Sequence, residues 1–234
     1  MCGRYAASRR PDELIEEFEI ESATTQIIPP SWNVAPTQSV YMIVQNDDVR
    51  ALGIARWGLI PSWSKDPSIG AKMINARVET VAEKPSFRSA FKSRRCILPA
   101  DGYYEWYTPS DDGSAVRRPK QPFYIHRTDT KSLAMAGLYE QWTDPESSKS
   151  LTTVTIITTS AVGSIALIHD RMPVLLPADR FGPWLNRNEK DSVALLDLLA
   201  VKDADRNLIA TAVSTQVNSV RNNNVSLIGP IPLQ

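Results

Sequence analysis

The chain has 234 residues, of which 42% are hydrophobic and 22% are charged, and its 26 basic and 26 acidic residues give a formal net charge of zero. This composition is typical of a globular protein of one or two domains, and it argues against a protein coated in basic charge. No stretch approaches the roughly 18 apolar residues of a membrane span, and no basic-then-apolar leader is visible. The two cysteines form neither a disulfide framework nor a zinc pattern, so we expect a cytoplasmic protein without membrane association.

The first quarter of the chain predicts a helix followed by a hairpin. Residues 11–20 predict the helix, because a proline suits its first turn, acids follow at its positive end, and apolar residues recur at helical spacing. Residues 28–36 are interrupted by prolines and predict irregular structure. The next segments predict a hairpin and a shaped loop, with strands at 39–45 and 49–57, a turn at 46–48 and the loop at 57–63.

The rest of the chain predicts many short strands, with most of its helices near the end. A helix at 86–93 precedes strands predicted at 95–99, 102–107, 121–127, 133–142 and 151–159. Residues 111–114 predict a loop within a polar insertion. Helices near 162–168, 178–186 and 191–200 and a closing strand at 209–217 complete the chain. Because no regular βαβ alternation is present, we predict an antiparallel-rich α+β fold in a single domain over residues 1–234.

Charge is distributed unevenly along this neutral chain. Residues 11–49 hold eight acidic residues and no Lys or Arg, whereas residues 84–95 hold five basic residues and no acidic residue. A focused basic surface suits local contact with a few phosphates. The same pattern equally suits a solvated face beside a compensating acidic one, so composition alone leaves both interpretations open.

The second residue, Cys2, has the most distinctive chemistry in the sequence. If Met1 is removed, Cys2 carries an α-amine and a thiol on adjacent carbons, and this pair reacts with aldehydes. The amine forms a Schiff base, and the thiolate then closes a thiazolidine ring in an intramolecular step with an effective molarity of ~10⁵ M or more. Taken alone, however, Cys2 is more simply interpreted as an ordinary small residue near the start of the chain.

Two residues could serve as an acid–base pair. His169 follows a predicted helix and lies in a loop-like position, where catalytic groups concentrate, but a hydrogen-bonded loop histidine is an equally good interpretation. Glu105 lies in an aromatic strand, and burial would raise its pKa toward the range useful for general acid–base catalysis if it faces inward. Strand alternation instead favours a solvent-facing Glu105. His126 and Cys96 are expected to be structural.

Arginine and tryptophan residues near these segments could contact nucleic acid. Arg77 and Arg171 could bind phosphate, although surface salt bridges are the commoner role. Trp63 and Trp106 could stack on bases, although buried core aromatics are commoner. None of these residues decides the function by itself.

Five short motifs, in this order and spacing, resemble a known family. They are Met-Cys-Gly-Arg-Tyr at 1–5, Trp-Gly-Leu-Ile-Pro-Ser-Trp at 57–63, Asn-Ala-Arg-Val-Glu-Thr at 75–80, Gly-Tyr-Tyr-Glu-Trp at 102–106 and His-Asp-Arg-Met-Pro at 169–173. Together they resemble the SOS response-associated peptidase (SRAP) family of abasic-site processing proteins, and the likeness extends from residue 2 to about residue 220. The resemblance implies an antiparallel β-rich, barrel-like core flanked by short helices.

The resemblance also implies a role for each matching residue. Cys2 would attack the ring-opened aldehyde of an abasic deoxyribose in single-stranded DNA and form a thiazolidine crosslink after Met1 is removed. Asn75 would orient the substrate or the N-terminal backbone, whereas Glu105 and His169 would move protons. Nearby arginines would favour the thiolate form of the cysteine. The residues implied to contact the DNA are Arg4, Trp63, Arg77, Trp106 and Arg171.

Two other functions stay open at this point. A cysteine peptidase would use Cys2 as nucleophile, His169 as base and Glu105 as orienting group, with its own Met1 as the favoured target. A noncovalent reader of damaged DNA would use the aromatic and basic residues without chemistry. For the crosslinking function we expect no cofactor and no metal. We also expect abasic single-stranded DNA as partner, a monomer, some abasic-site lyase activity, and a cytoplasmic location that becomes nucleoid-associated on DNA.

Overall fold

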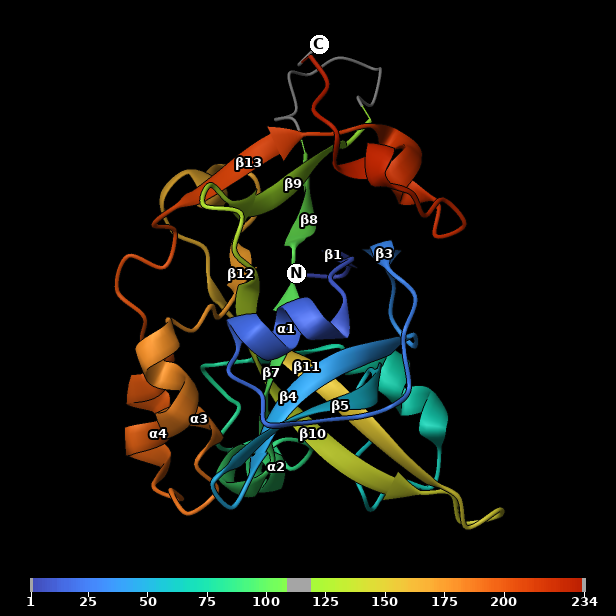
Figure 1. The fold of residues 1–234 in the computed structure, drawn as a ribbon, viewed down its shortest axis with the longest axis vertical. Coiled ribbons are helices and arrows are strands. Elements are labelled where there is room, and N and C mark those ends of the chain that lie inside the picture. The colour runs from blue at the N-terminus through green and yellow to red at the C-terminus, as the bar shows by residue number, and fades with distance from the viewer. Residues whose placement is uncertain (1, 109–118, 233–234) are drawn as a thin grey trace.

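The strands of the molecule form two sheets that share one continuous stretch of chain. The computed structural model describes residues 2–108 and 119–232, so the loop expected at 111–114 lies outside the described residues. Strand β7 (Arg95–Ala100) continues through Asp101 directly into β8 (Gly102–Tyr107), and these two strands belong to different sheets. In Figure 1 the larger sheet lies in the lower half, the smaller sheet in the upper half, and the N-terminus between them. The first residues of the chain therefore lie at the junction of the two sheets.

The larger sheet closes on itself. Its other strands are β2 (Ser22–Ala23), β4 (Ser39–Asn46), β5 (Val49–Trp57), β10 (Leu133–Thr143), β11 (Ser150–Ser160) and β12 (Arg171–Pro173). The strand order is β12-β11-β10-β7-β4-β5-β2, and β11 also pairs in parallel with β5. This additional pairing joins β4, β5, β7, β10 and β11 into a closed barrel. The short strand β6 (Asn75–Arg77) adds to β11 in parallel.

The smaller sheet is built around the N-terminal strand. Its other strands are β1 (Tyr5–Ala7), β3 (Ser31–Val34), β9 (Gln121–Arg127) and β13 (Leu208–Ala212), in the order β13-β9-β8-β1-β3. Tyr5 lies opposite Val34 on one side and opposite Tyr103 on the other, and both pairings are antiparallel. Because β1 has a partner on each side, the sheet holds the backbone next to Cys2 firmly in place.

Strand alternation divides most of the hydrophobic core into an inner and an outer cluster, and a third, smaller cluster that includes Tyr104 and Tyr124 lies on the smaller sheet. Along β7, Cys96 and Leu98 belong to one cluster, whereas Ile97 belongs to the other. The buried residues of the α-helices belong to the cluster of Ile97, so the cluster of Cys96 and Leu98 fills the barrel interior. Cys2 and Tyr5 belong to this inner cluster. The N-terminal strand therefore packs onto the interior of the barrel.

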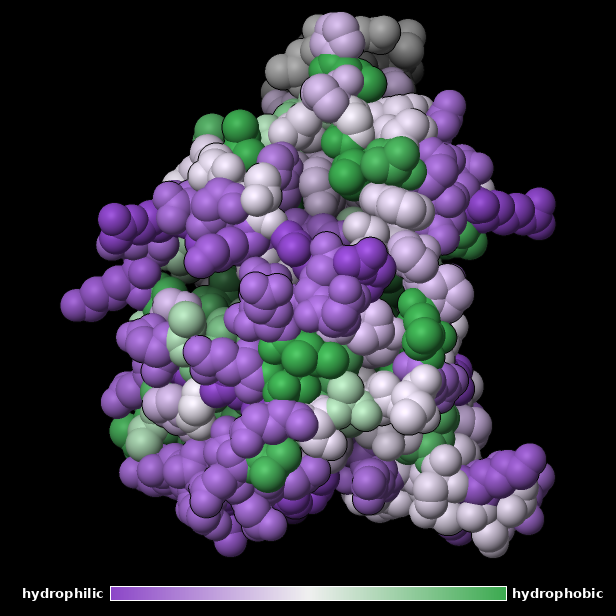
Figure 2. Space-filling view, viewed as in Figure 1, coloured by the Kyte–Doolittle hydropathy of each residue, from purple (hydrophilic) through white to green (hydrophobic). Residues whose placement is uncertain are grey.

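The two 3-10 helices nearest the C-terminus pack against the smaller sheet, whereas the short α-helices cover the outside of the barrel. They are α1 (Pro11–Glu17), α2 (Arg88–Ser93), α3 (Phe181–Leu185) and α4 (Ser192–Leu199), with 3-10 helices at Pro67–Lys72, Gly163–Leu167, Ala178–Arg180, Thr215–Asn218 and Val225–Ile228. The Asp191 side chain caps α4, as predicted, by accepting from the backbone N–H of Val193. In the described part of the chain, no helix is long and apolar enough to cross a bilayer. Figure 2 shows that the apolar residues on one face gather in small patches among hydrophilic ones.

The structure confirms the α+β class and the main strands, and it differs from the prediction at several element ends. The helix expected at 11–20 ends at Glu17, because Glu19 adopts a left-handed φ of 52° and turns the chain away. The helix expected at 162–168 is a 3-10 helix. The strand expected at 209–217 ends at Ala212, because the Ser214 side chain caps a 3-10 turn that follows. No sequence pattern predicts β1, β3, β6 or β12, which are too short for alternation to be visible.

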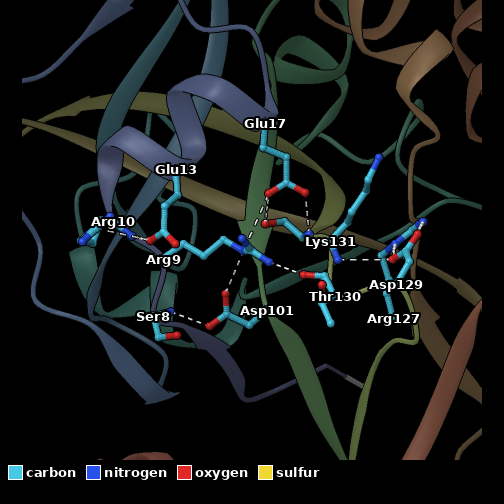
Figure 3. Close-up of polar contacts among 11 residues, drawn as sticks. Ser8, Arg9, Arg10, Glu13, Glu17, Asp101, Arg127, Asp129, Thr130 and Lys131 are labelled. Carbon is cyan, nitrogen blue, oxygen red and sulfur yellow. Dashed lines mark hydrogen bonds and ion pairs between the residues drawn. The ribbon is translucent and has the colours of Figure 1, made fainter.

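An ion-pair network anchors the chain where it leaves β1 (Figure 3). Nε of Arg9 lies 3.8 Å from a carboxylate oxygen of Glu17 and 3.7 Å from one of Asp101. The guanidinium also donates to the backbone oxygen of Thr130, and the backbone N–H of Ser8 donates to Asp101 at 2.6 Å. The network connects the end of β1 to α1, to the start of β8 and to the turn before β10.

Replacing Arg9 with Ala is expected to lower the free energy of unfolding by ~1–2 kcal/mol, because the Asp101 side chain, 16% exposed, loses its cation. Arg10 provides the matched control, since it pairs with Asp12 where both side chains are 68% exposed. Arg10→Ala should lower the same free energy by less than ~0.5 kcal/mol. Urea unfolding of both variants measures the difference, and equal losses would contradict a stabilising role for the Arg9 network.

Candidate active site at the N-terminus

Cys2 lies at the junction of the two sheets, just before β1. Its side chain is fully buried in the inner core cluster. The side-chain amide of Asn75 donates from Nδ2 to the backbone oxygen of Cys2 at 2.8 Å. Asn75 is itself held on the barrel, because β6 pairs with β11 and places Asn75 opposite Ile156. The barrel wall thus positions the Cys2 backbone through one side-chain amide.

Glu105 faces the interior of the molecule. The alternation of β8 places Tyr103 and Glu105 on one face and Tyr104 and Trp106 on the other. Glu105 is only 2% exposed, so the alternative of a solvent-facing carboxylate is wrong. Burial raises the pKa of Glu105 to about 7, and the Asp170 carboxylate acts in the same direction. Near pH 7 this carboxyl group is therefore able both to accept and to donate a proton.

His169 lies beside Glu105, with 3.9 Å between its Nε2 and an oxygen of that carboxyl group. The backbone N–H of Arg171 donates to Nδ1 of His169 at 3.0 Å, which leaves the proton of the neutral ring on Nε2, facing Glu105. An oxygen of Asp170 also lies 2.8 Å from Nδ1, a contact that would require the other tautomer. We assign the tautomer from the backbone donor, because the Asp170 side chain is 84% exposed and solvated. Burial lowers the pKa of His169, which favours the neutral ring.

The Cys2 thiol is held in its protonated form. Burial raises the pKa of the thiol well above its ordinary value, and the nearby Glu105 carboxylate raises it further. The expectation that arginines ionise this thiol is therefore wrong for the protein without DNA. The guanidinium of Arg4, the arginine nearest in sequence, is instead bound to Asn33 and to the backbone oxygen of Val217. A buried, protonated thiol needs a base before it can act as a nucleophile. The Glu105 carboxylate is close enough to raise the pKa of the thiol, and its own pKa of about 7 suits it to act as that base.

The predicted DNA-contacting residues Arg4 and Trp106 both contact one segment near the C-terminus. Nη1 of Arg4 donates to the backbone oxygen of Val217 at 2.9 Å. Nε1 of Trp106 donates to Oδ1 of Asn218 at 2.7 Å, and the Trp106 ring is half-buried. The structure therefore places both side chains in contact with the same segment, at Val217 and Asn218.

The other three predicted DNA-contacting residues have different environments. Arg171 is 8% exposed, and both of its terminal nitrogens bind the carboxylate of Glu79 in a bidentate ion pair. Arg77 is exposed and lies two residues after Asn75 on β6, so the strand pleat directs both side chains to the same side. Trp63 is 63% exposed in the loop after β5, which rules out the buried-core interpretation of this tryptophan.

Four residues beside the site were not predicted to be functional, although Tyr5 and Tyr103 lie within two of the five motifs. The hydroxyl groups of Tyr5 and Tyr103 are buried without a hydrogen-bond partner among the described residues, and both side chains belong to the core cluster of Cys2. Asn33 and Asn218 bind the side chains of the predicted DNA-contacting residues. Asn33 lies in the proline-interrupted segment 28–36, whose pattern predicts only a loop.

Comparison with known proteins points to one family. A family model described as SOS response associated peptidase (SRAP) matches residues 1–220. The abasic site processing protein YoqW of Bacillus subtilis is 44% identical over 233 residues, which cover 97% of this chain and 99% of that protein. The abasic site processing protein YedK of Escherichia coli is 30% identical over 99% of this chain and 100% of its own length. The abasic site processing protein HMCES of Xenopus tropicalis is 30% identical and is covered over 79% of its length.

A solved structure has the same fold. The crystal structure of a protein from Bacteroides thetaiotaomicron superposes with a TM-score of 0.86 at 25% identity, covering 99% of this chain and 100% of that one. The family model and the relatives each match most of the chain, and the five motifs lie within the matched region. The chain therefore belongs to the SOS response-associated peptidase (SRAP) family.

Proposed function

We propose that this protein processes abasic sites in single-stranded DNA by forming a covalent crosslink through Cys2. The observation that carries the proposal is the arrangement around Cys2, whose backbone is held by Asn75 and whose thiol is buried near a carboxyl group with a pKa of about 7. The names of the relatives support abasic DNA as the substrate. An abasic deoxyribose in its open form presents an aldehyde, which is the functional group that an N-terminal aminothiol captures.

The chemistry begins once Met1 is removed and the α-amine of Cys2 is exposed. The amine attacks the aldehyde carbon, and the resulting carbinolamine loses one water to give an imine. The thiol sulfur then adds to the imine carbon, a C–S bond forms, and the thiol proton ends on the nitrogen. The balance is the loss of one water, with no oxidant or reductant. Because both nucleophiles belong to Cys2, ring closure is intramolecular.

The proton transfers require a base for the thiol and an acid for the departing hydroxyl group. In this proposal Glu105 accepts the thiol proton and returns it to the nitrogen, since its pKa of about 7 suits both directions. His169 carries its proton on Nε2, 3.9 Å from Glu105, and supplies it to the oxygen that leaves the carbinolamine. Asn75 keeps the Cys2 backbone in place through both steps.

The DNA strand would cross the exposed basic and aromatic residues around Cys2. We assign Arg77 to a phosphate contact, because it is exposed on the same strand as Asn75. Arg171 would reach a phosphate only if its ion pair with Glu79 opens, so we expect a smaller contribution from it. The exposed ring of Trp63 would stack on a base, a contact worth ~1–3 kcal/mol.

Two further reactions follow from the same groups. A Schiff base that is not captured by the thiol permits β-elimination, so we assign weak abasic-site lyase activity to the protein, and reversal of the crosslink would use the same proton transfers. The family description and the acid–base pair near Cys2 favour a second candidate, in which Cys2 and Glu105 remove Met1 without another enzyme. Intact mass of Glu105→Gln tests this second activity, since retention of Met1 in that variant but not in the wild-type protein would support it. We infer that the protein acts as a monomer in the cytoplasm, at the DNA.

One incubation tests the proposed function. Purified protein is mixed with single-stranded DNA that carries one abasic site, and the products are separated under denaturing conditions. We expect an adduct whose intact mass equals the protein without Met1, plus the DNA, minus one water. DNA with a tetrahydrofuran residue, which has no aldehyde, is the matched control and should give no adduct. Equal native-gel shifts of both DNAs without an adduct would overturn the proposal in favour of a noncovalent reader.

A further inference from the structure

We infer that Asn33 is a positioning residue that fixes Arg4 and Trp106 on the DNA-contacting surface by holding residues 215–223 against β3. We call residues 215–223 the C-terminal clasp. The inference rests on the proposed function for the identity of the ligand, single-stranded DNA. It adds a residue to which neither the family motifs nor the relatives' names assign a role.

Asn33 uses both ends of its side-chain amide. It is 1% exposed and lies on β3. Oδ1 accepts from Nη1 of Arg4 at 2.7 Å. Nδ2 faces three backbone oxygens of the clasp, those of Val217 at 3.3 Å, Ser219 at 3.0 Å and Asn222 at 2.8 Å. One buried amide therefore connects Arg4, near the N-terminus, to three backbone oxygens of one segment near the C-terminus.

The clasp in turn contacts Arg4 and Trp106, the two side chains for which this inference takes the predicted role of contacting DNA. The backbone oxygen of Val217 accepts from Arg4 at 2.9 Å, and Oδ1 of Asn218 accepts from Nε1 of Trp106 at 2.7 Å. Figure 1 shows the C-terminal segment passing over the end of β3, next to the smaller sheet. Without the clasp, Arg4 would lose one acceptor and Trp106 its hydrogen-bond partner. The orientation of both side chains therefore depends on contacts made by Asn33.

Removal of the Asn33 donors should release the clasp without disturbing the groups that carry out the chemistry. A buried carbonyl that loses its donor is left with an unsatisfied acceptor, which favours rearrangement of the segment that carries it. Cys2 and Asn75 are held by a separate contact between β6 and the N-terminal backbone. We therefore expect a loss of DNA affinity with little change in the crosslinking rate at saturating DNA.

The test uses Asn33→Asp, which keeps an oxygen for Arg4 and replaces the Nδ2 donor with a second oxygen. The affinity for single-stranded DNA without an abasic site is measured by fluorescence anisotropy, and the crosslinking rate constant is measured with saturating abasic DNA. We expect Kd to rise by about fivefold to tenfold and the saturating rate constant to change by less than about twofold. Asn33→Ala repeats the measurement, so that a folding defect in one variant leaves the other informative.

Two controls separate positioning from a general loss of stability. Arg9→Ala is expected to destabilise the other end of β1, and its Kd should stay within about twofold of the wild-type value. In the Trp106→Ala, Arg4→Ala background, Asn33→Asp should raise Kd by less than about twofold, because both side chains that it positions are already absent. The inference would be overturned if Asn33→Asp still raised Kd by about fivefold to tenfold in the protein that lacks both side chains. It would also be overturned if neither Asn33 variant changed Kd. Binding without an adduct in the wild-type protein would instead contradict the proposed crosslinking and leave the Asn33 measurement valid.

Discussion

Replacing Cys2 with Ala is expected to abolish the denaturation-stable DNA adduct, with a loss of at least ~10²-fold in yield. When the variant is prepared with its chain beginning at residue 2, it keeps an α-amine there and can still form an imine with the abasic aldehyde. It has no sulfur to close the ring, and the advantage of an intramolecular second nucleophile is lost. The uncaptured imine should instead follow β-elimination, so strand cleavage should rise as the adduct disappears. Denaturing electrophoresis measures both products in one lane.

Cys96 is the matched control for this variant. It is the second cysteine of the chain, it is also fully buried in the inner core cluster, and burial likewise raises the pKa of its thiol. Cys96→Ala should keep the adduct at the wild-type level, since its thiol has no adjacent α-amine. A short tag placed before Met1 should also remove the adduct in otherwise unchanged protein. A Cys2→Ala adduct at the wild-type level would exclude thiazolidine formation.

In protein prepared with its chain beginning at Cys2, replacing Glu105 with Gln is expected to slow crosslinking by ~10²-fold or more, because the variant keeps the shape of the side chain but removes the base for a thiol of raised pKa. In the wild-type protein the single-turnover rate should rise with pH as Glu105 loses its proton near pH 7, and then level off. In Glu105→Gln this inflection should be absent. A retained inflection near pH 7 would assign the titration to another group.

The same substitution should stabilise the protein above pH 7. The pKa of Glu105 is raised from 4.5 to about 7, so the unfolded state ionises more readily than the folded state between these values. The contribution of Glu105 to stability is therefore fully favourable below about pH 4.5, declines as the pH rises to about 7, and stays low above it, a change of ~3 kcal/mol. Chemical unfolding at pH 5 and pH 8 measures this difference.

Glu140 is the control for that stability measurement. It is also a buried glutamate, 6% exposed, but Nε of Arg94 lies 2.9 Å from one of its oxygens. Glu140→Gln should therefore destabilise the protein, by ~1–3 kcal/mol, because a charge-assisted contact is lost and Arg94 is left without its anion. At pH 8 we therefore expect Glu105→Gln to raise the free energy of unfolding and Glu140→Gln to lower it. A destabilised Glu105→Gln would contradict the raised pKa.

The parts of the fold that local patterns predict are the long strands and the capped helix. Strands β4 and β5 lie within one residue of the predicted hairpin ends, because their alternating sequence and the polar turn between them are local signals. The short strands β1 and β6 were not predicted, because no local pattern indicates them. They are strands only through partners far along the chain, such as Tyr103 opposite Tyr5 and Ile156 opposite Asn75.

The sequence by itself determined which chemical groups are available. A cysteine follows Met1, so an aminothiol can be exposed, and the order of the five motifs identifies the family that the comparisons confirm. Glu105 and His169 were also visible as an acid–base pair, because glutamate and histidine are the side chains suited to that task near neutral pH. The burial, protonation state and hydrogen-bond partners of these groups could not be predicted from the sequence.

The tertiary structure alone decided the state and the support of these groups. It turned Glu105 inward, kept the Cys2 thiol protonated against the expectation from nearby arginines, and bound Arg171 to Glu79. The physical reason is that desolvation and hydrogen bonding depend on which distant segments meet. Arg4 and its acceptor Val217 are 213 positions apart, and no local periodicity records such a contact. The sequence therefore determines that a cysteine follows Met1, whereas the burial and the hydrogen-bond partners of that cysteine are determined by the fold.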